Sequence, residues 1–338
     1  IRQQVLPQVR RTHGINPRAA IPPVAGGILF MGFSDSVRKN RGLPLRSGNG
    51  YCIMYFLNGK LLKGGSGMDN RPIGVFDSGL GGLTAVKALR QILPEEKLIY
   101  FGDTARVPYG GRSKETLLKY ARQDVRFLRS FDLKAIVIAC GTVSTTSLDT
   151  LQAENDLPIV GVVEPTCRRA LLVTKNKKVG IIATLASIRS GAYEAMLRRL
   201  DPAVEIIGKP CPLFVPLVEN GRISRGDVVI ETVAREYLKP LKATGVDTLI
   251  LGCTHYPLLT EIIGDIMGPE VTLVSAGEES AFELKRLLKA GSLRADEGQT
   301  GGVDFYVSDR PEDFEKIASV FLGTELSHGA ERINIEQY

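Results

Sequence analysis

The sequence predicts an α/β fold in which two similar Rossmann-like or flavodoxin-like parallel-sheet domains face each other across a cleft. From Pro72 onward, short runs of aliphatic and β-branched residues alternate with longer segments of helical period. This alternation is typical of parallel sheets with right-handed helical crossovers. Two of the strands end in cysteines, Cys140 and Cys253, which lie about one domain length apart in a chain of 338 residues.

Each predicted strand is a short apolar run bounded by turn formers, and each predicted helix has apolar residues at a period near 3.6. In the first domain, a Gly-rich turn over 77–82 follows the first strand, and a loop over 102–112 follows the second. The expected strands cover 73–76, 97–101, 136–140 and 159–163, and the expected helices cover 83–93, 113–131 and 145–155.

The second domain repeats this order, and the chain then returns to the first. Its strands are expected over 178–183, 204–207, 249–253 and 271–275, and its helices over 165–174, 187–200, 225–243 and 258–267. A helix over 278–290, a strand over 303–307 and a helix over 311–321 follow. The predicted boundaries are 68–164 plus 275–323 for the first domain, 165–274 for the second and 324–338 for a C-terminal tail.

Residues 1–67 contain Pro-Pro, Gly-Gly and Gly-Asn-Gly breaks and no sustained period, so we expect a disordered or non-native leader. Its arginines resemble those of a transit peptide, but its serine content and amphipathic pattern are weak. Lys63-Gly64-Gly65 is what a purine-rich ribosome-binding sequence would encode, and Met68 shortly precedes the first well-formed strand. We therefore expect that this leader is translated from sequence upstream of the natural start codon, and that the natural protein begins at Met68.

The net charge of +6 does not indicate a nucleic-acid partner, because the basic residues concentrate in the leader. Residues 1–67 hold ten Lys/Arg and one acid, Asp35, whereas the remaining 271 residues hold 33 bases and 36 acids. No basic stripe or RNA-binding motif follows. Five irregularly spaced cysteines indicate a reducing compartment, and no apolar run reaches the roughly 20 residues of a membrane span. We expect a cytoplasmic protein.

Cys140 and Cys253 are the main candidates for chemistry, because ligands of open α/β sheets collect at the carboxyl ends of strands. Backbone N–H groups and the dipole of a following helix favour a thiolate there. Either cysteine could instead be a small core residue, which is the interpretation we adopt for Cys52, Cys167 and Cys211.

Asp77 and His255 accompany these cysteines. The turn Asp77-Ser-Gly-Leu-Gly-Gly82 lacks the glycine order and the lysine of nucleotide-binding loops. The turn could bind the carboxylate of a ligand at the start of the following helix, with Asp77 as the charged partner of a thiol or ammonium. Alternatively, Asp77 and its neighbour form only a helix N-cap. His255 could exchange protons with Cys253 or with a ligand, or it could be structural. No second Cys/His cluster accompanies it, so no metal is expected.

Four motifs together resemble the motif set of the glutamate racemases, cofactor-independent members of the aspartate/glutamate racemase superfamily. They are Asp77-Ser-Gly-Leu-Gly-Gly82, Tyr100-Phe-Gly-Asp with Pro108-Tyr-Gly110, Ala139-Cys-Gly-Thr142 and Gly252-Cys-Thr-His-Tyr-Pro-Leu-Leu259. The likeness runs from Met68 to about Gly323. It implies an isomerase that interconverts L- and D-glutamate and supplies D-glutamate for peptidoglycan, and hence for cell wall biogenesis and cell shape.

The resemblance implies a two-base mechanism in an active-site cleft. Cys140 would deprotonate D-glutamate and Cys253 L-glutamate, each with the other thiol delivering a proton to the opposite face. Asp77 would support Cys140, while His255 and Glu219 would support Cys253. The substrate would be held by Asp77, Ser78, Pro108, Tyr109, Gly110, Gly141, Thr142, Thr184, Ser187, Thr254 and His255.

Two positions depart from the common family pattern. Gly141 stands where most relatives have asparagine, which removes a substrate contact, and Ser187 stands where threonine is common. Two other functions stay open: racemisation of aspartate or another amino acid, and non-catalytic binding in a retained cleft. Retention of both cysteines favours an enzyme. The resemblance further implies a small-molecule substrate, glutamate, and allows a homodimer.

Overall fold

The computed structural model describes residues 28–30, 53–57, 60–61, 68–326 and 328–338. The chain divides into two units, 1–62 and 63–338, which we describe separately. In the first unit, β1 (Ile28–Phe30), β2 (Ile53–Leu57) and β3 (Lys60–Leu61) form an antiparallel sheet in that order. We did not predict these short strands. The rest of the expected leader, including Cys52, lies outside the described residues.

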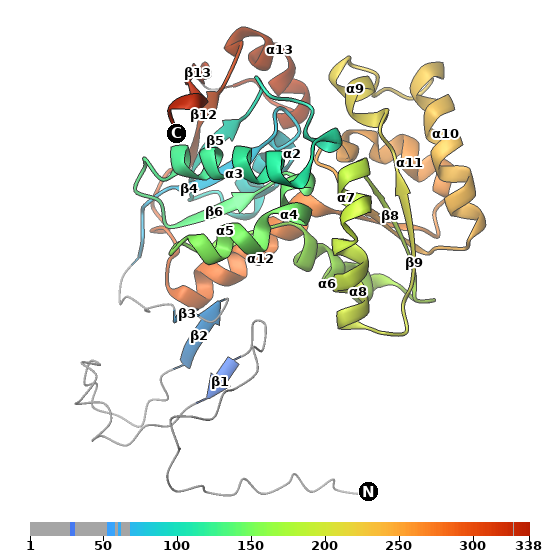
Figure 1. The fold of residues 1–338 in the computed structure, drawn as a ribbon, viewed down its shortest axis with the longest axis horizontal. Coiled ribbons are helices and arrows are strands. Elements are labelled where there is room, and N and C mark those ends of the chain that lie inside the picture. Colours follow the sequence, from blue (N-terminus) through green and yellow to red (C-terminus); the bar gives the residue numbers. More distant parts are fainter. Residues whose placement is uncertain (1–27, 31–52, 58–59, 62–67, 327) are drawn as a thin grey trace, which may run out of the picture. The chain divides into compact units, whose positions relative to one another are not determined.

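The second unit contains a six-stranded sheet in which every neighbouring pair of strands is parallel (Figure 1). The strand order is β13-β12-β5-β4-β6-β7. The strands are β4 (Ile73–Asp77), β5 (Lys97–Gly102), β6 (Ala135–Ile138), β7 (Ile159–Val160), β12 (Gly302–Val307) and β13 (Glu331–Arg332). The accompanying helices are α2 (Leu83–Ile92), η1 (Tyr109–Gly111), α3 (Lys114–Leu128), α4 (Gly141–Thr146), α5 (Leu148–Glu154), α12 (Ala276–Gly291) and α13 (Pro311–Leu322).

A four-stranded parallel sheet with the order β11-β10-β8-β9 forms the other half of this unit. Its strands are β8 (Lys178–Ala183), β9 (Glu205–Pro210), β10 (Thr248–Leu251) and β11 (Thr272–Ser275). Its helices are α6 (Val163–Val173), α7 (Leu185–Ser190), α8 (Ala192–Leu200), α9 (Phe214–Glu219), α10 (Val228–Ala243), η2 (Tyr256–Leu259) and α11 (Thr260–Met267).

The two sheets share one topology. In the six-stranded sheet, the order β5-β4-β6-β7 places β4, the earliest of these strands in the chain, between β5 and β6. The order β9-β8-β10-β11 repeats this arrangement, with β8 between β9 and β10. Cys140 follows β6 and Cys253 follows β10, so each cysteine comes after the third strand of its half. The predicted α/β fold with two similar parallel sheets is therefore confirmed.

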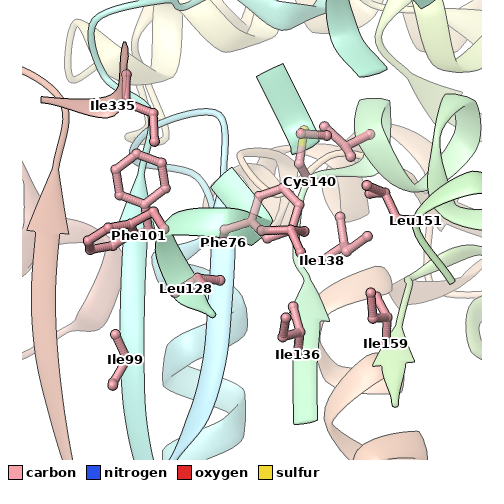
Figure 2. Close-up of a cluster of buried hydrophobic side chains, with 14 of the residues drawn as sticks. Phe76, Ile99, Phe101, Leu128, Ile136, Ile138, Cys140, Leu151, Ile159 and Ile335 are labelled. Carbon is pink, nitrogen blue, oxygen red and sulfur yellow. The ribbon is translucent and has the colours of Figure 1, made fainter. Parts of the chain in front are cut away.

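A buried hydrophobic cluster fixes the strand that leads to Cys140. Ile136, Ile138 and Cys140 alternate along the chain, so their side chains face the same side of the sheet, with Phe76 of β4 beside them (Figure 2). Ile136, Ile138 and Phe76 have no exposed surface, and burying such a side chain contributes about 1.5–3 kcal/mol. The position of the thiol is thus set by a packed core rather than by a free loop.

Some predicted elements are shorter or differently bounded in the structure. The helix expected over 145–155 is two helices, α4 and α5, that meet at Ser147. The helix expected over 187–200 breaks at Gly191, whose positive φ of 65° ends α7 and begins α8. The Pro-rich passage before Leu217 forms α9, which we did not predict, because prolines ordinarily argue against a helix.

Residues in the expected C-terminal tail join the first sheet. Glu331 and Arg332 form β13, which pairs in parallel with β12. Ile335 is 3% exposed and belongs to the same hydrophobic cluster as Phe76 (Figure 2). The last residues therefore contribute to the core of the half that carries Cys140.

Candidate active site

Both candidate thiols line one cavity, which has a volume of about 390 Å³. It lies where the carboxyl ends of β6 and β10 meet, the expected place for a ligand in two facing parallel sheets. Cys140 is 4% exposed and Cys253 is 7% exposed, so the sulfur atoms are largely shielded from water. The lining consists of Ser78, Val107, Pro108, Tyr109, Gly110, Gly111, Cys140, Gly141, Thr142, Thr184, Leu185, Pro212, Val215, Pro216, Glu219, Cys253, Thr254 and His255.

Cys140 forms one wall and is held at the start of a helix. Its backbone is extended, and it is the residue at which α4 begins. The Cys140 thiol lies 3.8 Å from the hydroxyl oxygen of Ser78, on the turn that follows β4. The neighbouring strands β4 and β6 therefore place a thiol and a hydroxyl side by side at the same edge of the sheet.

Cys253 also lines the cavity, and next to it lie first a histidine and then a carboxylate. The Cys253 sulfur lies 3.8 Å from His255 Nδ1. His255 Nε2 lies 2.9 Å from Glu219 Oε1, and Glu219 is the last residue of α9. Because the two ring nitrogens contact different partners, Glu219 orients the imidazole toward the sulfur, a common device for fixing a functional histidine.

The two thiols differ in their electrostatic surroundings. Burial, reinforced by the negative charge of Asp77, raises the pKa of the Cys140 thiol to about 12. The N–H of Val143 and the Ser78 hydroxyl oppose this only in part, so these surroundings disfavour the thiolate that we expected at this helix start. For His255, burial disfavours the charged ring, but the hydrogen bonds to Cys253 and Glu219 outweigh it and raise the pKa to about 10. The surroundings therefore favour a neutral thiol at Cys140 and a charged imidazolium at His255.

Asp77 lies behind the cavity rather than on its surface. The Asp77 side chain is fully buried, and the burial raises its pKa. It accepts a hydrogen bond of 3.1 Å from Gly79 N, and the Thr254 hydroxyl lies 3.4 Å from its Oδ1. Asp77 thus joins the Gly-rich turn of the first half to the Cys253 turn of the second.

Gly81 in the same turn packs against the second half. A Cβ atom on Gly81 would overlap the Thr254 hydroxyl and the His255 ring. Thr84, the second residue of α2, donates a hydrogen bond of 2.8 Å to the Thr254 carbonyl. The absence of a side chain at Gly81 therefore lets the two strand-end turns approach closely.

Three hydroxyls form a chain on the remaining side of the cavity. Thr142 Oγ1 lies 3.0 Å from Thr184 Oγ1, and Thr184 Oγ1 lies 3.1 Å from Ser187 Oγ. Thr142 belongs to α4 of the first half, whereas Thr184 caps the N-terminus of α7 in the second half and accepts a hydrogen bond from the Ser187 N–H. These neutral donors can serve a carboxylate without a charged partner.

Tyr109 is held rigidly by buried acids. Its hydroxyl donates to Asp103 and lies 3.3 Å from Asp124 Oδ2. Arg106 binds both carboxylates, with distances of 2.6 Å to Asp103 and 3.0 Å to Asp124. Burial and the two nearby carboxylates raise the pKa of Tyr109 well above its ordinary range, so the ring stays neutral. This network fixes the loop that carries Pro108, Tyr109 and Gly110 into the cavity.

Comparison with known proteins identifies the family. A family model for Asp/Glu/hydantoin racemases matches residues 84–279. A glutamate racemase of Geobacter metallireducens is 46% identical over 256 residues, which cover 76% of this chain and 94% of that protein. The chain belongs to the Asp/Glu/hydantoin racemase family.

Solved structures in the racemase family agree with this assignment. A glutamate racemase isoform from Bacillus anthracis superposes with a TM-score of 0.75 at 37% identity, covering 78% of this chain and 98% of that one. A glutamate racemase from Francisella tularensis, solved in complex with D-glutamate, superposes with a TM-score of 0.73 at 40% identity, covering 80% of this chain and all of that one.

Most of the residues singled out by the racemase motifs line the cavity. Asp77 and Ser187 do not, and both are fully buried behind it. Cys167 and Cys211 are also fully buried and do not line it, and Cys167 packs in the core of the second half. No helix in the described part of the chain has the length and apolar character needed to cross a membrane.

The motifs of the racemase family did not single out the apolar part of the lining. Sequence reasoning missed Val107, Gly111, Leu185, Pro212, Val215 and Pro216. Val107 and Leu185 are each adjacent in sequence to a residue that we selected, and this adjacency is the one sequence signal that could have indicated them. Pro212, Val215 and Pro216 lie in and just before α9, a helix that we did not predict.

Gly141, where we expected the loss of a substrate contact, packs tightly against the second cysteine turn. A Cβ atom on Gly141 would collide with the Gly252 carbonyl oxygen. In this chain, the backbone of the second cysteine turn occupies the space into which a side chain at position 141 would project.

Proposed function

We propose that this protein is a cofactor-independent glutamate racemase that interconverts L- and D-glutamate by two-base proton transfer between Cys140 and Cys253. The observation that carries this proposal is that the two thiols line one cavity from equivalent strand ends of two similar halves. Two monoprotic groups on different walls can flank a single carbon, which inversion at that carbon requires. A binding protein would need neither thiol.

In the direction from L- to D-glutamate, Cys253 acts as the base and Cys140 as the acid. The breaking Cα–H bond transfers its proton to the Cys253 sulfur, and its electrons remain on Cα as a carbanion conjugated with the α-carboxylate. The Cys140 S–H bond then delivers a proton to the opposite face of Cα. A raised pKa keeps Cys140 protonated for this step, and the cationic His255 is the type of neighbour that a reactive thiolate requires.

The reverse direction requires the opposite protonation states. Cys140 must then lose its proton inside a buried site beside Asp77, which costs free energy until the substrate ammonium enters. We propose that the buried Asp77 carboxylate accepts this proton, and that the bound ammonium offsets the charge of the resulting thiolate. The Cys140 thiolate then takes the Cα proton of D-glutamate. Cys253, which receives a proton from His255 oriented by Glu219, delivers a proton to the opposite face of Cα.

The carboxylates of glutamate are held by neutral donors in this proposal. Ser78, Thr142, Thr184 and Thr254 offer hydroxyls, Gly141 offers a backbone N–H, and Tyr109 with Pro108 and Gly110 shapes the wall around them. Ser187 supports Thr184 from behind. Such preorganised donors stabilise developing negative charge in a site that excludes water.

The direct test is circular dichroism of a panel of amino acids incubated with the purified protein, without any added cofactor. We expect L- and D-glutamate to lose optical activity, and aspartate and alanine to keep it. Loss of the signal for aspartate alone would redirect the assignment to another substrate. Cys140→Ala and Cys253→Ala should each abolish interconversion, and racemisation retained by either variant would refute the two-thiol mechanism.

The wider role follows from the same proposal. D-glutamate is a building block of peptidoglycan, and we propose that the enzyme supplies it for cell wall biogenesis in the cytoplasm. We further propose a homodimer, as the family likeness implies. Light scattering coupled to size exclusion would show a mass twice that of the chain.

A further inference from the structure

A second cavity adjoins the active-site cavity and is lined by basic side chains. It has a volume of about 310 Å³ and shares Gly110, Gly111 and Leu185 with the active-site lining. Arg112 and Lys114 reach it from the start of α3, and Arg189 reaches it from the end of α7. We call these three residues the basic vestibule. It lies between the two halves of the fold, because α3 belongs to the first and α7 to the second.

The three cations of the basic vestibule form no ion pair with a described Asp or Glu, although a backbone hydrogen bond and then the nearby charge of Lys114 lower the pKa of the neighbouring Glu115 carboxyl. By contrast, most other exposed arginines in the described part of the chain have an ion-pair partner. All three residues are exposed, so their charges face the solvent at the cavity. Three unpaired like charges around one concave site repel each other, which an entering anion would relieve.

The active-site cavity itself offers little positive charge. Its lining contains no Lys or Arg, and its one cationic side chain, His255, is already paired with Glu219. Asp77 stands buried behind it. Residues 68–338 together carry 33 bases and 36 acids, so this part of the chain does not attract anions by its net charge. The net charge of residues 68–338 therefore weakly repels a dicarboxylate, whereas the basic vestibule attracts it.

We propose that the basic vestibule captures the dicarboxylate substrate and directs it into the adjoining active-site cavity. This inference rests on the proposed function, because it takes glutamate as the ligand. Arg112, Lys114 and Arg189 do not contact the reacting carbon; they raise the local concentration of the anion at the entrance. Charged clefts act in this way on small ionic substrates, and the effect weakens as salt screens it.

The test compares two variants that carry the same change in net charge. In the first, Arg112, Lys114 and Arg189 are all changed to Gln. In the matched control, Arg90, Lys239 and Lys289 are changed to Gln; these are exposed residues of α2, α10 and α12 that line neither cavity. The measurements are kcat and kcat/KM for L-glutamate in 10 mM and 300 mM sodium chloride, and calorimetric binding of L-glutamate at the same two salt concentrations.

In 10 mM salt, we expect the vestibule variant to lose roughly fivefold in kcat/KM and in affinity, from three unit charges acting at about 10 Å, well within the screening length of about 30 Å. Its kcat should stay within about twofold of wild type, and the control variant should match wild type. In 300 mM salt the difference should nearly vanish, since the screening length then falls below about 8 Å.

Two results would overturn the proposal: equal kcat/KM for the vestibule and control variants in 10 mM salt, or a loss that persists unchanged in 300 mM salt. A fall in kcat with unchanged affinity would also contradict it, because it would place these residues in the chemical step. Failure of the proposed function looks different. In that case the wild type binds glutamate with the expected salt dependence but does not racemise it.

Discussion

Gly141 and Gly252 bring the two cysteine-bearing turns into direct backbone contact. Gly141 directly follows Cys140, and Gly252 directly precedes Cys253. A Cβ atom on Gly141 would collide with the Gly252 carbonyl oxygen, and a backbone atom cannot move aside as a flexible side chain can. The spacing of the two thiols in this chain therefore depends on the absence of a side chain at position 141.

Gly141→Ala should separate the two turns and reduce racemisation. A displacement of about 1 Å in a catalytic site can cost about 100-fold in rate, so we expect kcat to fall by roughly 10- to 100-fold while the protein stays folded. Gly302→Ala is the matched control, since an added Cβ atom there meets no atom within 4 Å. Wild-type kcat in Gly141→Ala, with an unchanged melting temperature, would show that the contact does not set the thiol spacing.

Glu219→Gln should lower the pKa of His255. In the wild type, the hydrogen bonds to Cys253 and Glu219 raise that pKa to about 10, against the effect of burial. An amide in place of the carboxylate keeps a polar contact but removes the negative charge that favours the imidazolium. The chain has three histidines, so NMR titration of the ring resonances can follow each. A titration midpoint for His255 that is the same in both proteins would contradict this account.

The raised pKa of His255 also predicts how stability depends on pH. A folded-state pKa of about 10, above the ordinary 6.5, means that the folded protein holds a proton that the unfolded chain releases. This contribution to the free energy of unfolding is fully present below pH 6.5 and is lost as the pH rises through 10. Denaturant melts of wild type and His255→Gln should therefore converge between pH 6.5 and pH 10.

His328→Gln is the control for this pH series, because His328 is exposed. Its curve of stability against pH should run parallel to that of the wild type. If His255→Gln also runs parallel to the wild type, the imidazole is not charged in the folded protein at neutral pH.

Ile335→Ala should destabilise the half of the fold that carries Cys140. Ile335 is 3% exposed in the hydrophobic cluster that includes Phe76, and truncations of this kind cost about 2–5 kcal/mol. Nearby, Glu336 lies 3.5 Å from Arg106, which braces the acids that hold Tyr109. Thermal melts would test this, with Val320→Ala on α13 as a control at a position that is 46% exposed. Equal melting temperatures for the two variants would mean that the C-terminal residues do not support the core.

The fold could largely be predicted because its signals are local. The apolar runs before Cys140 and Cys253 mark buried strands, and the periodic segments between them mark helices. Breaks such as Gly191 are less visible, because glycine is permitted in many conformations and only the tertiary structure selects a positive φ. The edge strand at Glu331 has no apolar pattern and depends on its pairing with β12.

The site could be predicted as a set of polar residues but not as a geometry. The motifs contain the two thiols and His255, and the family resemblance added Glu219. The apolar lining around Val215, in contrast, depends on α9 folding back over the cavity. The collision at Gly141 and the basic vestibule at Arg112 and Arg189 arise between segments far apart in the chain. No spacing in the sequence encodes such contacts.

The central claim is that two different thiols take and give the proton, and the isotope content of the first product tests it most directly. Racemisation is started from L-glutamate in deuterium oxide and stopped after a few per cent of conversion. We expect the D-glutamate formed to carry deuterium at Cα, because its new hydrogen comes from solvent-equilibrated Cys140, while the remaining L-glutamate retains protium. D-glutamate that retains the original protium at Cα would show transfer by a single base and contradict the account.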